Sequence, residues 1–90
     1  MELNIERFTL TGVEHAFTFE EERVKYMVKN FTAGDIYVAF KSGATQAKSI
    51  KIPSMSGQVC CARIAPPEPV LARTNTIYVT GTGEVEVQQL

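Results

Sequence analysis

Alternation of apolar and polar residues with a period of two is the feature that most constrains this chain. Residues 36–41 alternate in this way, and shorter versions of the pattern recur in 24–29, 50–52, 77–79 and 84–87. Successive side chains of a β-strand point to opposite faces of a sheet, so this period predicts strands with one buried face. For one segment the alternative is a helix that starts at residues 20–23 and has Val24, Met27 and Val28 as its apolar stripe.

Turn-forming residues separate the alternating segments and set the expected strand boundaries. The expected strands are 2–10, 14–20, 23–31, 35–42, 47–53, 57–64, 74–80 and 84–90. Gly81-Thr82-Gly83 is expected to form a tight reversal between the last two strands, because no helix follows it that could complete a phosphate loop. The proline-rich residues 66–69 are expected to form an extended loop or to cross a sheet edge.

Eight short strands about ten residues apart are typical of two-sheet architectures. They predict an all-β fold, namely an antiparallel β-sandwich or jelly roll of about 7–8 short strands, with a closed barrel as the alternative. Ninety residues suffice for one domain, so residues 1–90 are expected to form a single β-sandwich domain. The expected core residues are Phe17, Phe19, Val24, Val28, Ile36, Val38, Phe40, Ile50, Ile52, Ile77, Val79, Val85 and Val87.

The charge balance argues against nucleic acid and membrane partners. Nine basic residues oppose ten acidic ones, and no basic cluster stands out. A nucleic-acid-binding protein usually needs a basic face to displace phosphate counterions. No stretch approaches the roughly 20 apolar residues of a bilayer-spanning helix, and the N-terminus does not resemble a signal peptide. The chain is therefore expected to be made in a cytoplasm.

The residues that usually perform catalysis or bind metals are scarce. His15 is the only histidine and Asp35 the only aspartate. No nucleophile motif accompanies His15, which is expected to face solvent on a strand beside Glu14. The two cysteines are adjacent and cannot form the spaced ligand pairs of a zinc site. The sequence thus predicts that the chain is not an enzyme and has no cofactor or metal.

Cys60 and Cys61 are neighbours, so on a strand they point to opposite faces. Ordinary disulfide geometry does not fit such a pair. Two reduced thiols are expected, at least one of them packed as a small apolar residue. A vicinal redox pair is the alternative; it needs a basic neighbour, and Arg63 is the nearby candidate.

Tyr37 and Tyr78 are the candidate interaction residues. Each lies between two apolar residues that are expected in the core, so both rings are expected on outer faces. Exposed tyrosines serve protein interfaces and carbohydrate contacts because the ring packs while the hydroxyl bonds. Packing against a neighbouring strand is the alternative role.

Two segments, 28–40 and 75–87, resemble parts of small virion proteins of tailed bacteriophages and prophages. Both contain an Ile-Tyr-Val strand, and the second continues through a Gly-x-Gly turn into a Val-x-Val strand. The resemblance covers residues 24–90, from which residues 58–73 depart. It implies an oligomeric head-decoration, head-fibre, neck or tail-associated component without a cofactor, made in the host cytoplasm and then associated with the virion.

The leading hypothesis is therefore a virion structural protein that self-associates and contacts other virion proteins. Its contacts are expected through a sheet edge or through an outer face that carries Tyr37 or Tyr78. A carbohydrate-binding module that stacks a glycan on one of these tyrosines is the second hypothesis. An enzyme with a non-standard site is the third, and the residue inventory disfavours it.

Overall fold

Strands make up most of the regular structure in this computed structural model, which describes residues 4–62 and 73–90. In chain order they are β1 (Ile5–Thr11), β2 (His15–Arg23), β3 (Lys25–Asn30), β4 (Ile36–Ala39), β5 (Ile50–Ile52), β6 (Gly57–Cys61), β7 (Thr74–Thr80) and β8 (Thr82–Gln89), with one 3₁₀ turn, η1 (Gln46–Lys48), before β5. Each expected strand corresponds to one of these, which confirms the all-β prediction. The helical alternative for residues 20–28 is wrong, because they belong to β2, β3 and the single residue between them. The predicted loop at 66–69 lies outside the described residues.

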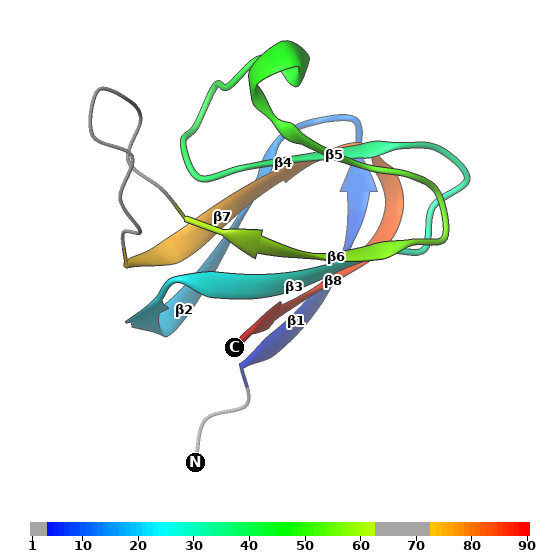
Figure 1. Ribbon diagram of the computed structural model, residues 1–90. Coiled ribbons are helices and arrows are strands. Elements are labelled where there is room, and N and C mark those ends of the chain that lie inside the picture. Colours follow the sequence, from blue (N-terminus) through cyan, green and yellow to red (C-terminus); the bar gives the residue numbers. More distant parts are fainter. Residues whose placement is uncertain (1–3, 63–72) are drawn as a thin grey trace.

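The strands form two four-stranded antiparallel sheets that pack face to face (Figure 1). The β8 sheet has the order β1-β8-β3-β6, and the β7 sheet has the order β2-β7-β4-β5. The pairing is nested: the first strand pairs with the eighth, the second with the seventh, the third with the sixth and the fourth with the fifth. Such nesting describes one long antiparallel hairpin wrapped into two sheets, which is the jelly-roll arrangement.

The link between β7 and β8 differs from the expected hairpin. β7 pairs with β2 and β4, whereas β8 pairs with β1 and β3, so the chain changes sheets at Gly81. The crossing brings the backbone very close to the link between β3 and β4 and to the first residue of β4. A Cβ on Gly81 would lie 2.8 Å from the Ile36 Cγ2 atom, and one on Gly83 would lie 2.9 Å from the Thr32 Cγ2 atom. Both glycines are thus explained by close approach rather than by a hairpin turn.

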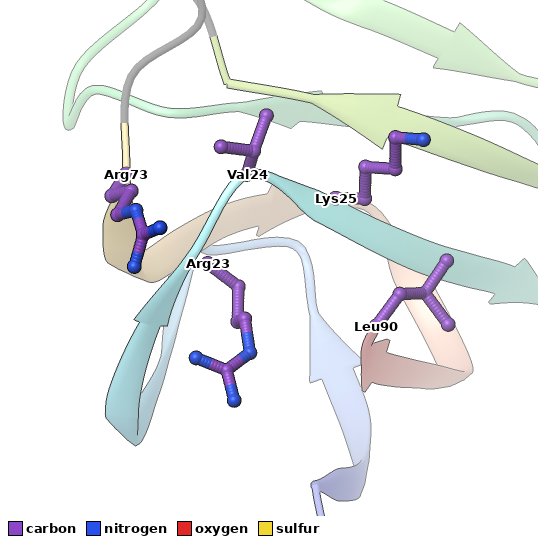
Figure 2. A pocket seen from close by; sticks show the side chains of 5 residues that line it. All are labelled: Arg23, Val24, Lys25, Arg73 and Leu90. Carbon is purple, nitrogen blue, oxygen red and sulfur yellow. The ribbon is translucent and has the colours of Figure 1, made fainter.

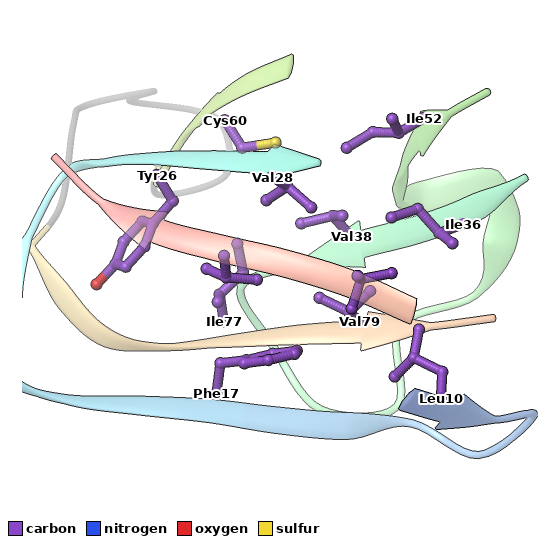
Figure 3. Packing of buried hydrophobic residues seen from close by; sticks show 12 residues of the cluster. Leu10, Phe17, Tyr26, Val28, Ile36, Val38, Ile52, Cys60, Ile77 and Val79 are labelled. Carbon is purple, nitrogen blue, oxygen red and sulfur yellow. The ribbon is translucent and has the colours of Figure 1, made fainter. Parts of the chain in front are cut away.

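The core fills the space between the two sheets, with Tyr26 at one end and Leu10 at the other (Figure 3). Nine of the expected core residues are buried, and Phe19, Phe40 and Ile50 pack against them only in part. Val24 was wrongly expected in the core: it is the single residue between β2 and β3, is only partly buried and does not belong to the core cluster. The nine buried residues are Phe17, Val28, Ile36, Val38, Ile52, Ile77, Val79, Val85 and Val87.

The polar side chain of Asn30 is among the most deeply buried, with 1 % exposure. Its amide nitrogen donates to the carbonyl oxygens of Gly34, Ile52 and Pro53 at 2.9–3.0 Å. Its side-chain oxygen accepts a hydrogen bond from the Thr32 N–H at 2.8 Å. Asn30 therefore holds the link between β3 and β4 against the end of β5, and its bond to the Ile52 carbonyl satisfies a buried acceptor.

Candidate interaction surfaces

Tyr37 and Tyr78 lie on the outer face of the β7 sheet. Each alternates with buried residues on its strand and is itself only partly buried. Tyr37 pairs with Thr80, and Tyr78 pairs with Ala39, so the two rings are diagonal neighbours on adjacent strands. Side chains in this relation lie within reach of one another on the same face of the sheet.

Small and hydroxyl-bearing residues surround the two tyrosines. Ala16 and Ala39 flank Tyr78 on the neighbouring strands. Nearby, the Thr18 and Thr76 hydroxyls lie 3.3 Å apart. The exception is Lys51 on β5, which lies directly opposite Tyr37 and brings a positive charge to this face.

A cavity of about 490 Å³ opens beside Tyr37, where the links β1–β2, β3–β4 and β7–β8 meet. Its lining combines the Tyr37 ring with the side chains of Asp35, Gln46, Thr80 and Thr82. Asp35 is also paired with the Lys51 ammonium group at 3.4 Å. An aromatic ring among amide, carboxylate and hydroxyl groups can contact a ligand through both packing and hydrogen bonds. Tyr78 does not line this cavity.

The outer face of the β8 sheet has a different character. The strand register places Ile5, Gln88, Met27 and Val59 in one row across all four strands. Ile5 is 49 % exposed and Val59 is 42 % exposed. Gln88 on β8 separates Ile5 from the other two apolar side chains, so the continuous apolar part of this row is Met27 on β3 and Val59 on β6.

A charged row lies next to the apolar row. Glu86 on the central strand β8 is paired with Arg7 on β1 at 2.8 Å and with Lys29 on β3 at 3.4 Å. The carboxylate of Glu86 is largely covered, whereas both cations extend into solvent. The hydrogen bond from Arg7, helped by Lys29, lowers the pKa of Glu86 although burial opposes this effect. This row ties three strands of the β8 sheet together.

Beyond Lys29, a second cavity of about 300 Å³ lies next to the start of β6. Met27, Phe31 and Met55 supply its apolar lining. Phe31 is 46 % exposed and Met55 is 72 % exposed. The apolar surface on the β8 sheet therefore gathers near β6.

A third cavity, of about 350 Å³, lies where β2 passes into β3 (Figure 2). Arg23, Lys25 and Arg73 line it. The Arg23 guanidinium already pairs with the Glu21 carboxylate, and Lys25 points away from the two arginines. The cations do not converge on one point, so this cavity lacks the geometry of an anion site.

His15 does not face solvent as expected. It is partly buried at the margin between the sheets, where its ring stacks on Phe8 with 3.6 Å between the centroids. The edge of His15 also meets Phe17 in the core. Its neighbour Glu14 accepts hydrogen bonds from the Ser42 hydroxyl and the Gly43 N–H, which lowers the pKa of Glu14. His15 thus packs against two phenylalanine rings instead of facing solvent.

The two cysteines are free thiols, and they lie on opposite faces of β6 as expected. Cys60 is buried in the core, and this burial raises the pKa of its thiol to about 11. Cys61 is only partly buried and lies on the outer face. The prediction that one thiol packs as a small apolar residue is confirmed. Arg63 lies outside the described residues.

Within residues 4–62 and 73–90, no group of three or more His, Cys, Asp or Glu side chains is arranged to hold a metal ion. The same part of the chain includes no helix that is long and apolar enough to cross a membrane. A scan against protein-family models gave no match, and neither did searches of the curated proteins and of the solved structures.

Proposed function

We propose that this chain is a non-enzymatic structural or assembly protein of a tailed-bacteriophage or prophage particle that acts through protein–protein contacts. The observation that carries the proposal is the apolar outer face of the β8 sheet, where Met27 and Val59 lie near the exposed Phe31 and Met55. Apolar side chains gathered on a solvent face, with charges beside them, are typical of surfaces that pack against other chains.

The fold is consistent with this role. Jelly rolls are frequent among viral capsid domains, although they also occur in lectins, so the fold alone does not assign a function. A 90-residue domain buries a limited share of its surface, and contacts between chains add buried apolar area. The resemblance of residues 24–90 to small virion proteins supplies the phage context.

The assembly role is tested by measuring the solution mass by light scattering coupled to size-exclusion chromatography. We expect a mass that exceeds 10.0 kDa and rises with concentration. A mass of one chain at every concentration would contradict assembly by self-association. The phage context is tested separately by the genes beside the coding sequence: capsid, portal or tail genes are expected, and metabolic genes would count against it.

Carbohydrate binding is the second candidate function, and the cavity beside Tyr37 favours it. The ring can stack on a sugar, while Asp35 and Gln46 can bond its hydroxyl groups. A glycan array would identify a ligand, and the Tyr37→Ala variant should then lose binding. Tyr78→Ala is the matched control, because Tyr78 lies on the same face outside the cavity. Equal binding by both variants would refute this site.

A further inference from the structure

The four edge strands of the sandwich are the places where another chain can continue a sheet. They are β1 and β6 in the β8 sheet, and β2 and β5 in the β7 sheet. An edge strand presents backbone N–H and C=O groups that its own sheet does not pair. Natural proteins usually prevent pairing at such edges with charges, bulges, inward-pointing charged residues or very short strands.

Three of the four edges carry such features. β2 has an irregular register after Thr18, followed by the glutamates at 20–22. β5 has only three residues, with Lys51 at its centre. β1 carries Glu6 on its core side, opposite the buried Val87. Each of these features opposes the addition of another strand.

β6 carries none of these features. Its five residues, Gly57 to Cys61, include no charge and no proline, and their register with β3 is regular throughout. The central residue Val59 points to the outer face and is 42 % exposed. β6 is therefore the edge strand of the described chain that is best suited to pairing.

Among residues 4–62 and 73–90, the hydrogen bonds at both ends of β6 show which of its backbone groups the sheet does not pair. The Ala62 N–H donates to the Val24 carbonyl oxygen at 2.9 Å, and the Asn30 N–H donates to the Ser56 carbonyl oxygen at 2.8 Å. Because pairing alternates along an antiparallel ladder, the even-numbered residues of this segment bond to β3. The N–H and C=O groups of residues 57, 59 and 61 consequently point away from the sheet.

We propose that β6 pairs antiparallel with β6 of a second copy of this chain, about a two-fold axis at Val59. This proposal rests on the proposed assembly role and names the contact that serves it. Val59 then lies opposite Val59 of the second copy, and Gly57 lies opposite Cys61. Each facing pair exchanges two hydrogen bonds, so three pairs form about six, and the two β8 sheets become one sheet of eight strands.

The side chains at this edge favour a second copy as the partner. When the two-fold axis passes through Val59, each of the three outward-facing residues of β6 lies opposite an outward-facing residue of the second copy. None of these residues is charged, so no like charges face one another. The apolar row of Met27 and Val59 continues directly into the same row of the second copy. The apolar cavity at Phe31 and Met55 lies beside this junction. The contact is thus complementary to itself, as a two-fold interface requires.

The first test compares Val59→Lys with the matched control Val13→Lys. Val13 is 69 % exposed in the link between β1 and β2, away from β6. Val59→Lys places two ammonium groups opposite one another at the axis, so we expect the dimer dissociation constant to rise at least about tenfold. Light scattering should show the mass fall from twice 10.0 kDa towards 10.0 kDa, with no such change in the control. Circular dichroism would verify that both variants fold.

The second test reads the register through a disulfide. Gly57→Cys places a thiol opposite Cys61 of the second copy, where Cα atoms about 5.5 Å apart allow a bridge. A Cβ at Gly57 meets its nearest neighbour at 3.4 Å, so the variant should fold. Mild oxidation should yield a covalent dimer, whereas Gly34→Cys, in an open link elsewhere, should not.

The outcomes separate this contact from the assembly role. An oligomer that resists Val59→Lys and gives no covalent dimer with Gly57→Cys overturns the β6 contact but leaves assembly in place. A single-chain mass at all concentrations, without crosslinking, overturns both. Loss of mass in Val59→Lys together with crosslinking in Gly57→Cys supports the contact.

Discussion

Asn30 joins three separate segments through one amide group. Its nitrogen faces the carbonyl oxygens of Gly34, Ile52 and Pro53, so a carboxylate here would meet acceptors instead of donating to them. A substitution that removes the donor from these acceptors and buries an unpaired charge is among the most destabilising single changes. We expect Asn30→Asp to lower the free energy of unfolding by about 3 kcal/mol or more, measured by urea denaturation at pH 7.

Asn75→Asp is the matched control for this variant. The Asn75 side-chain oxygen accepts a hydrogen bond from the Thr76 hydroxyl at 3.0 Å, and a carboxylate retains that acceptor. Its effect should stay within about 1 kcal/mol. Equal unfolding curves for Asn30→Asp and the unchanged protein would show that the Asn30 network contributes nothing.

The adjacent thiols should differ sharply in reactivity. Burial raises the pKa of Cys60 to about 11, so at pH 8 almost none of it is the reactive thiolate, and reagents cannot reach it in the core. Cys61 is partly exposed on the outer face. Mass spectrometry after brief alkylation should find one label on the folded chain, at Cys61, and two labels in urea. Two labels without urea would contradict the packing of Cys60.

At the level of elements, the crossing from β7 to β8 depends on glycine. Gly83 has a φ of +121°, and its Cβ position is occupied by Thr32, so Gly83→Ala meets both backbone strain and a clash. We expect thermal unfolding to show a loss of about 1–3 kcal/mol. Gly34→Ala, which has nothing within 4 Å of its Cβ, should be neutral or slightly stabilising. Equal melting temperatures for the two variants would refute this explanation.

The period-two alternation located β3, β4, β5, β7 and β8, because each of these strands buries one face and that requirement is local. Turn-forming residues bounded the other three. The alternation could not reveal which strands share a sheet: Gly81-Thr82-Gly83 has the composition of a hairpin turn, but it connects two sheets. The placement of Val24 was missed for a similar reason. Val24 is the single residue between β2 and β3, and no glycine or proline marks that end of the strand in the sequence.

Across the whole molecule, the two outer faces offer different chemistry. The alternation correctly directed Tyr37 and Tyr78 outward, but which sheet they share and the cavity beside Tyr37 depend on the fold. The apolar row on the other face was missed, although Met27 and Val59 alternate with core residues of their strands. Only the strand register shows that these residues are neighbours, because they belong to different segments of the chain.

The acid stability of the fold should depend on Glu86, whose carboxylate joins β1, β8 and β3. The hydrogen bond from Arg7 and the pairing with Lys29 lower its pKa in the folded state. A carboxylate whose pKa is lower in the folded state than in the unfolded state stabilises the fold fully at pH values above its unfolded-state pKa. This stabilisation is lost as the pH falls through its folded-state pKa. Glu86→Gln should therefore be less stable than the unchanged protein at pH 7, with the difference shrinking below about pH 4. Urea midpoints across this range would measure it. Glu84→Gln is the control, because Glu84 lies on the same face but is exposed. Its loss of stability should be smaller and should change less with pH. If the stability difference between Glu86→Gln and the unchanged protein stayed constant at all pH values, the ion-pair row would be refuted.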